Sequence, residues 1–160
     1  MALRDAGPQG RRIAAQPRDG GGMLILPSAL RRQLLAAAKA AFPAEACGLV
    51  IGRRDGATVT VTALAPATNM SPTPRDSFAI DPAVQFSRQR AIRGSGQAVI
   101  GCYISHPNGR SEPSPRDREA GDWGGCDSGF IWIIIATGVK EAVAAFDGPS
   151  FQPLTIRVSP

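Results

Sequence analysis

The sequence predicts a single α/β (α+β) domain, in which helices pack on a mixed β-sheet. With 160 residues, 43% of them hydrophobic, the chain is long enough for one packed core and too short for two ordinary domains. Patterns typical of buried strands alternate along it with patterns typical of helices. The longest apolar run, FIWIIIA at 130–136, has the length of a strand, whereas a membrane span takes roughly 20 residues.

The first elements follow a polar stretch. Residues 1–22 are rich in glycine and arginine and lack hydrophobic periodicity, so we expect a disordered basic tail before a domain at 23–160. MLILP at 23–27 predicts a short strand. Ser28 is then expected to cap a helix. One face of that helix carries apolar residues at helical spacing: Leu30, Leu34, Ala38 and Ala41.

A hairpin and a long loop come next. ACGLVIG at 46–52 and the alternating TVTVTAL at 58–64 predict two strands joined by a turn at Asp55-Gly56. PATNMSPTPRDS at 66–77 is a long loop of a kind that is often functional in a compact domain. Asn69 in this loop either lines a groove for an extended peptide or is merely part of the connection. A short strand, FAI, is expected after the loop.

The second half supplies two helices and the remaining strands. Asp81-Pro82 is a strong helix start, and that helix is expected to run to about Arg93 and stop at Gly94. QAVIGCYIS predicts a central strand ending at His106. Ser114-Pro115 predicts a short helix, broken near Gly121. The expected closing strands are FIWIIIAT at 130–137, KEAVAAF at 140–146 and LTIRV at 154–158.

Cysteine usage and charge restrict the function classes. Cys47, Cys102 and Cys126 are odd in number and widely spaced, which argues against a disulfide framework or a cysteine-rich zinc module. The N-terminus lacks the apolar region of a secretory signal, so a cytoplasmic protein is expected. The net charge of +5 permits acidic partners, but no Lys/Arg cluster is interleaved with aromatic residues. We therefore do not expect nucleic-acid binding, and we leave open whether the protein forms a homo-oligomer.

The segment GCYISHPNGRSEPSPRD, residues 101–117, carries candidate chemistry. A strand end at His106 and a helix start at Asp117 can bring an imidazole and a carboxylate onto one metal ion. Glu45, at the start of another strand, is a candidate general base for a metal-activated water. Ser114 is placed to hydrogen-bond a developing oxyanion. By spacing alone, however, Ser114-x-x-Asp117 is also a capping-box variant, and a lone histidine or glutamate needs no function.

The same segment resembles the motif of the JAMM (MPN-plus, JAB domain) metallopeptidases. That motif reads His-x-His-Pro, several residues, Pro-Ser, two residues and Asp. Here Ser105-His106-Pro107 match, seven residues separate His106 from Ser114, and Asp117 is in register. Upstream, AEACGLVIG resembles the glutamate-bearing strand of the family, and PTPRDSFAIDP resembles the connector of its short bacterial members. The resemblance covers roughly residues 23–160.

The resemblance implies a curved mixed β-sheet with packed helices and one zinc ion as cofactor. It implies that Glu45 is the general base, Ser114 the serine beside the oxyanion, and His106 and Asp117 two of the zinc ligands. Members of the family hydrolyse peptide or isopeptide bonds, commonly after the C-terminal tail of a ubiquitin-like protein. Short bacterial members resemble enzymes that trim or release ubiquitin-like sulfur carriers, so a protein with such an extended tail is the implied partner.

One position departs from the family pattern. Ile104 stands where the family has its first histidine ligand, and isoleucine has no lone pair. Because loss of even an outer-shell partner costs about 10–100-fold in metal affinity or activity, loss of a ligand should cost at least as much. Cys102 lies on the same strand face, about 6–7 Å away, and is a candidate substitute ligand. Cys47 has a similar claim, although both cysteines also suit a buried apolar role.

Two hypotheses therefore stay open. The first is a zinc-dependent JAMM peptidase that Ile104 weakens. The second is a non-catalytic MPN-like module that binds a ubiquitin-like protein or a partner subunit without cutting it.

Overall fold

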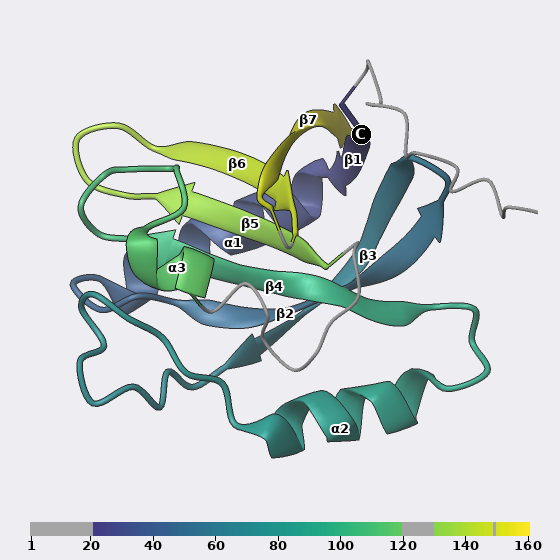
Figure 1. Ribbon diagram of the computed structural model, residues 1–160, viewed down its shortest axis with the longest axis horizontal. Helices are drawn as coiled ribbons and strands as arrows, with labels where there is room; N and C mark the ends of the chain where they lie inside the picture. Colours follow the sequence, from purple (N-terminus) through teal and green to yellow (C-terminus); the bar gives the residue numbers. More distant parts are fainter. Residues whose placement is uncertain (1–20, 120–129, 149) are drawn as a thin grey trace, which may run out of the picture.

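The computed structural model describes residues 21–119, 130–148 and 150–160 and has the predicted α/β (α+β) class (Figure 1). Its helices are α1 (Ser28–Ala41), α2 (Pro82–Ile92) and α3 (Pro115–Glu119). Its strands are β1 (Met23–Pro27), β2 (Cys47–Asp55), β3 (Thr58–Ala67), β4 (Ala98–His106), β5 (Ile131–Ala136), β6 (Ala142–Asp147) and β7 (Gln152–Ser159).

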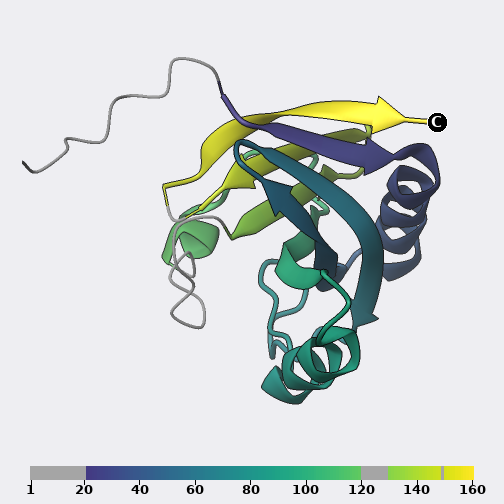
Figure 2. The same ribbon diagram turned by 90° about the vertical axis from the view of Figure 1, so that its right-hand side faces the viewer.

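The strands form one mixed, strongly curved sheet. Their order is β1-β3-β2-β4-β5-β6-β7, and the sheet closes because β1 pairs in parallel with both β3 and β7. The β4–β5 pair is also parallel, and the other neighbours are antiparallel. Figure 2 shows β1 and β7 side by side, with β3 curving away below them. The curved mixed sheet is thus confirmed, and its closure into a barrel goes beyond the prediction.

The core is divided between the two faces of the central strands. Side chains of a strand alternate between faces, so β5 contributes Ile133 to one buried cluster and Ile134 to the other. α1 covers the first cluster with Leu34 and Ala38. The second contains Trp132 in edge-on contact with Phe78, at a ring-centroid distance of 5.8 Å. Burial on both faces explains the unbroken apolar run of β5.

The start of the chain departs from prediction at one residue. Both β1 and α1 are confirmed, but the expectation that Ser28 caps α1 is wrong. The pairing of β1 with β7 continues through Pro27 and Ser159, so the chain passes directly from strand to helix. Pro27 occupies the cap position, and no side chain of the described residues makes a cap hydrogen bond. On the predicted apolar face Leu34 and Ala38 are buried, while Leu30 and Ala41 are half-buried.

The expected FAI strand is also wrong. Residues 78–80 have no strand structure; Phe78 packs on Trp132, and Ile80 is buried in the second cluster. The helix that follows is as predicted, because the Asp81 carboxylate accepts a hydrogen bond from the amide of Ala83 (2.9 Å). None of the residues of α2 is buried, and the helix lies apart from α1 (Figure 2).

The remaining elements follow the prediction closely. β2 and β3 form the predicted hairpin, and β4 ends at His106. Most of the predicted basic tail, Cys126 and the helix break near Gly121 lie outside the described residues. Within the described part of the chain, no helix is long and apolar enough to cross a membrane. A cytoplasmic location stays a prediction.

Candidate functional site

The candidate site forms where β2 begins and β4 ends. Cys47 pairs with Ile104 in antiparallel register, so residues just before Cys47 lie beside residues just after Ile104. Two further hydrogen bonds extend this pairing: the amide of Ser105 donates to the carbonyl of Ala46 (3.0 Å), and the amide of Ala46 donates to Oγ of Ser105 (2.7 Å). The strand ends thereby bring Glu45 and His106 to one place, as the sequence predicts.

His106 is held by both of its ring nitrogens. Nδ1 lies 2.9 Å from the carbonyl oxygen of Arg110, and Nε2 lies 3.0 Å from Oδ2 of Asp117. A carbonyl only accepts hydrogen bonds, so Nδ1 carries a hydrogen and Nε2 is the nitrogen that faces the carboxylate. Either Nε2 is protonated and forms an ion pair, or its lone pair and the carboxylate share a cation. An Nδ1–H bonded to a carbonyl is the usual support of a metal-binding histidine.

The helix start fixes Asp117 through a reciprocal cap. The amide of Ser114 donates to Oδ2 of Asp117 (2.7 Å), and the amide of Asp117 donates to Oγ of Ser114 (3.1 Å). The capping interpretation is therefore correct, and it is compatible with the chemical one, because the cap aims the carboxylate at His106. The guanidinium of Arg118, 5.5 Å from the ring centre of Phe151, holds this short helix against the barrel.

Glu45 is the third ionisable group of the site. Its side chain is only 6% exposed, and no described residue provides a hydrogen bond to its buried Oε2. Burial raises the pKa of Glu45 from 4.5 to about 7; nearby His106 opposes this shift, while the charge of Asp117 adds to it. A carboxyl group with a pKa near neutrality is suited to accept and donate protons.

Burial and charge act in opposite directions on His106. Burial alone lowers its pKa, but the hydrogen bond and charge of Asp117, together with the charge of Glu45 and the bond to the Arg110 carbonyl, outweigh this effect and raise the pKa above its ordinary value of 6.5. Without a metal ion, these interactions therefore favour the protonated form of the imidazole.

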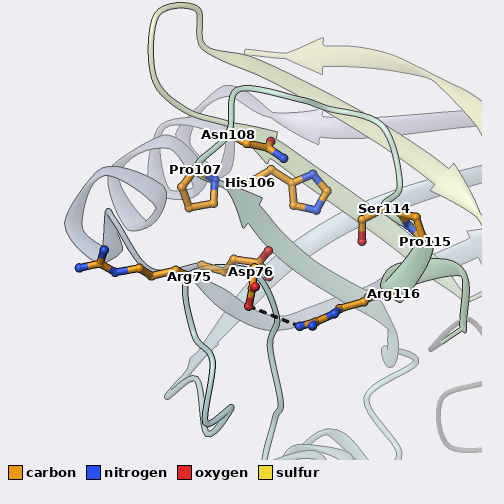
Figure 3. Close-up of a pocket in the computed structure, with 9 residues that line it drawn as sticks. Arg75, Asp76, His106, Pro107, Asn108, Ser114, Pro115 and Arg116 are labelled. Carbon is orange, nitrogen blue, oxygen red and sulfur yellow. Dashed lines mark hydrogen bonds and ion pairs between the residues drawn. The ribbon is translucent and has the colours of Figure 1, made fainter.

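Beside Glu45 and His106 lies a cavity of about 410 Å³ (Figure 3). Three of the predicted site residues, Glu45, His106 and Ser114, line it, and Asp117 does not. The other lining residues were not predicted as site residues; they are Arg75, Asp76, Pro107, Asn108, Pro115 and Arg116. Across the cavity mouth Asp76 of the 68–77 loop pairs with Arg116 of α3 at 3.3 Å. The sequence signals for this wall were the Pro/Ser/Asn composition of the loop and the resemblance of PTPRDSFAIDP to the connector of the family.

Ile104 and the two cysteines lie behind the site in the second core cluster. Ile104 is 0% exposed and shares this cluster with Cys47 and Cys102. Neither cysteine lines the cavity. Burial raises the pKa of the Cys47 thiol to about 11, which disfavours the thiolate form that zinc binds. Their substitution for the absent histidine stays a prediction, and the positions of both cysteines offer it no support.

The donor atoms present fit a zinc ion in part. Nε2 of His106 and Oδ2 of Asp117 converge, and the buried, unpartnered Oε2 of Glu45 belongs to the same site. A catalytic zinc usually has three protein ligands, and Ile104 supplies none. Within residues 21–119, 130–148 and 150–160, no three His, Cys, Asp or Glu side chains are grouped for a metal. The site thus offers zinc two protein ligands.

Comparison with known families agrees with this architecture. A family described as prokaryotic homologues of the JAB domain matches residues 27–147. The barrel, together with the motif at the end of β4, defines a JAB-domain protein. The chain belongs to the JAMM (MPN-plus) family, in its prokaryotic JAB branch.

Individual relatives extend the comparison. The chain is 33% identical to desampylase of Haloferax volcanii over 116 residues, which is 72% of this chain and 79% of the relative. It is 31% identical to a probable TtuB-protein conjugate cleaving protease of Thermus thermophilus over 138 residues, which is 86% of this chain and 84% of the relative.

Solved structures share the fold. A protein from Desulfitobacterium hafniense superposes with a TM-score of 0.73 at 28% identity, over 86% of this chain and 93% of the other. A JAB1/MPN domain protein from Archaeoglobus fulgidus superposes with a TM-score of 0.55 at 21% identity, over 88% of this chain and all (100%) of the other, and it supports the fold alone.

Proposed function

We propose that the protein is a JAMM-type hydrolase that cleaves a peptide or isopeptide bond at the C-terminal tail of a ubiquitin-like or sulfur-carrier protein. The observation that carries this proposal is the buried, unpartnered Oε2 of Glu45 in one cavity with His106, whose Nε2 pairs with Asp117. The names of two relatives, desampylase and TtuB-protein conjugate cleaving protease, support the substrate class.

Each residue has a role that its surroundings suit. Glu45 takes a proton from the attacking water and passes it to the leaving amine, because its pKa lies near neutrality. Ser114, at the cavity wall, hydrogen-bonds the oxyanion that develops on the scissile carbonyl. His106 and Asp117 are the residues that would hold zinc. When bound, zinc supplies Lewis-acid polarisation of the carbonyl and of water.

A cleavage assay tests this function. The purified protein, supplied with zinc, is incubated with a ubiquitin-like protein fused through its Gly-Gly tail to a reporter. We expect cleavage by the unmodified protein and a rate at least about 100-fold lower for Glu45→Gln, since general bases contribute that much or more. Glu119→Gln, the same change at an exposed acid of α3, is the matched control and should cleave normally. No cleavage by the unmodified protein, or equal cleavage by Glu45→Gln, contradicts the proposal.

Ile104 motivates a second candidate, a non-catalytic MPN-like module. A site with two protein ligands binds zinc weakly, and the same cavity then serves to bind an extended tail or a partner subunit. Binding of the ubiquitin-like protein without turnover, at any zinc concentration and unaffected by Glu45→Gln, would favour this function. Turnover that depends on Glu45 excludes it.

A further inference from the structure

Asn69 connects the loop that forms one cavity wall to the residue proposed as general base. Its amide nitrogen Nδ2 donates to three main-chain carbonyl oxygens, those of Glu45 (3.1 Å), Pro74 (3.4 Å) and Ser77 (3.0 Å). Its oxygen Oδ1 accepts from two amides, those of Ser71 (3.0 Å) and Ala79 (3.1 Å). One half-buried side chain thus bonds to Glu45 and to main-chain groups along the turn from residue 69 to residue 79.

The main chain of Glu45 depends on this loop. Glu45 precedes β2, so no neighbouring strand provides for its main-chain polar groups. Its carbonyl accepts from Asn69, and its amide donates to the carbonyl of Pro74 (2.7 Å), which also accepts from Asn69. Both polar groups of the Glu45 main chain are therefore fixed by Asn69, one directly and one through Pro74.

Other hydrogen bonds also hold the turn, among them that from the amide of Met70 to the carbonyl of Ala79 (2.8 Å) and those linking Ser71, Thr73 and Ser77, but none of these reaches Glu45. The Asp76–Arg116 pair links the loop to α3, but both of its side chains are largely exposed, and exposed pairs contribute only about 0–1 kcal/mol. Only an amide supplies donors and an acceptor from one short side chain. An aspartate of the same size keeps the acceptor and turns the three donor contacts into repulsion between oxygens.

We propose that Asn69 is a positioning residue. It acts through the main chain of Glu45 and through the turn from residue 69 to residue 79. It thereby sets the direction of the Glu45 carboxylate and the shape of the cavity wall. This inference rests on the proposed function for the role of Glu45, but the positioning itself is measurable without substrate.

The first test is amide hydrogen exchange in zinc-free protein. Asn69→Asp, which loses the donors, should speed exchange at Glu45 at least about ten-fold and leave the core amides of β5, such as Ile133, unchanged. Asn69→Ala, which also removes the acceptor, should speed exchange at both Glu45 and Ala79. Gln97→Ala, which removes a side-chain bond to Thr62 (2.7 Å) away from the cavity, is the matched control and should change neither amide of interest.

The second test separates positioning from stability. Corrected for the folded fraction, kcat of Asn69→Asp should fall about 10–100-fold, as when an outer partner of a site is removed, with a smaller change in KM. Unchanged exchange at Glu45, equal acceleration throughout the chain, or local loss of protection with normal kcat would each overturn the inference. If the unmodified protein cleaves nothing, the proposed function fails, and the exchange data then decide the positioning by themselves.

Discussion

Nε2 of His106 and Oδ2 of Asp117 lie 3.0 Å apart, and both side chains are almost completely buried. The pair joins the end of β4 to the first turn of α3. With Nδ1 committed to the Arg110 carbonyl, this pair determines whether the site holds a proton or a metal ion.

The protonation of His106 follows from this pair. His106 is the only histidine of the chain, so its ring signals are identified directly in an NMR titration. In zinc-free protein the pKa of His106 should lie above 6.5, and Asp117→Asn should lower it, because the charge and hydrogen bond that raise it are lost. Glu119→Gln should leave it in place. An unchanged His106 pKa in Asp117→Asn contradicts the pairing.

Stability should depend on pH through Glu45. In zinc-free protein the folded-state pKa of Glu45 is raised from 4.5 to about 7, so between these values the folded state binds more protons than the unfolded state. Stability should therefore fall as pH rises through this window, by at most about 3 kcal/mol. The raised pKa of His106 acts in the same direction above pH 6.5.

Urea unfolding in the presence of a chelator, at pH 5 and at pH 7.5, measures this loss. Glu45→Gln has no titrating group at this position and should lose less stability between the two pH values, whereas Glu119→Gln should behave like the unmodified protein. Equal losses for all three proteins would mean that Glu45 titrates normally.

Ile104 should stabilise the hydrophobic core, although it supplies no ligand to the site. Ile104→Ala removes a fully buried side chain from the second cluster and should lower the free energy of unfolding by about 2–5 kcal/mol. Val158→Ala, at a largely exposed position of β7, should cost no more than about 0.5 kcal/mol. Denaturant unfolding checks both, and a near-neutral Ile104→Ala would place residue 104 outside the core.

Cys47 and Cys102 should be protected from alkylation, and neither should be needed for metal binding. In a Cys126→Ser background, alkylation at pH 8 should label Cys47 at least about 100-fold faster in urea than in the folded protein, because burial keeps its thiol protonated. Mass spectrometry follows the labelling. Cys102→Ser should leave zinc affinity within about two-fold, whereas a loss comparable to that for removal of a ligand, about ten-fold or more, would identify Cys102 as the substitute ligand.

Local signals predicted the parts of the structure that depend on local interactions. The Asp81 cap, the apolar run of β5 and the end of β4 at His106 all follow from neighbouring residues. The Ser114–Asp117 cap was also visible in the spacing, and it places the Asp117 carboxylate.

Interactions between distant segments account for what the sequence did not predict. Barrel closure requires Met23 to pair with Thr155, and no local pattern encodes that register. The predicted FAI strand does not form, because Phe78 packs on Trp132 and the amide of Ala79 donates to Asn69. Tertiary contacts thus take the place of hydrogen bonds to a neighbouring strand. For Asn69 the sequence offered only a groove for a peptide or a simple connection, because its hydrogen-bond network exists only once the turn is folded.

Zinc affinity of the zinc-free protein, measured calorimetrically beside Ile104→His and Ile104→Ala, tests the central claim most directly. The claim is that His106 and Asp117 form a JAMM zinc site that lacks one ligand, because Ile104 stands where the family has a histidine. We predict that Ile104→His binds zinc at least about ten-fold more tightly than the unmodified protein, while Ile104→Ala, which adds no donor, does not. Equal affinity of the unmodified protein and Ile104→His would contradict the claim.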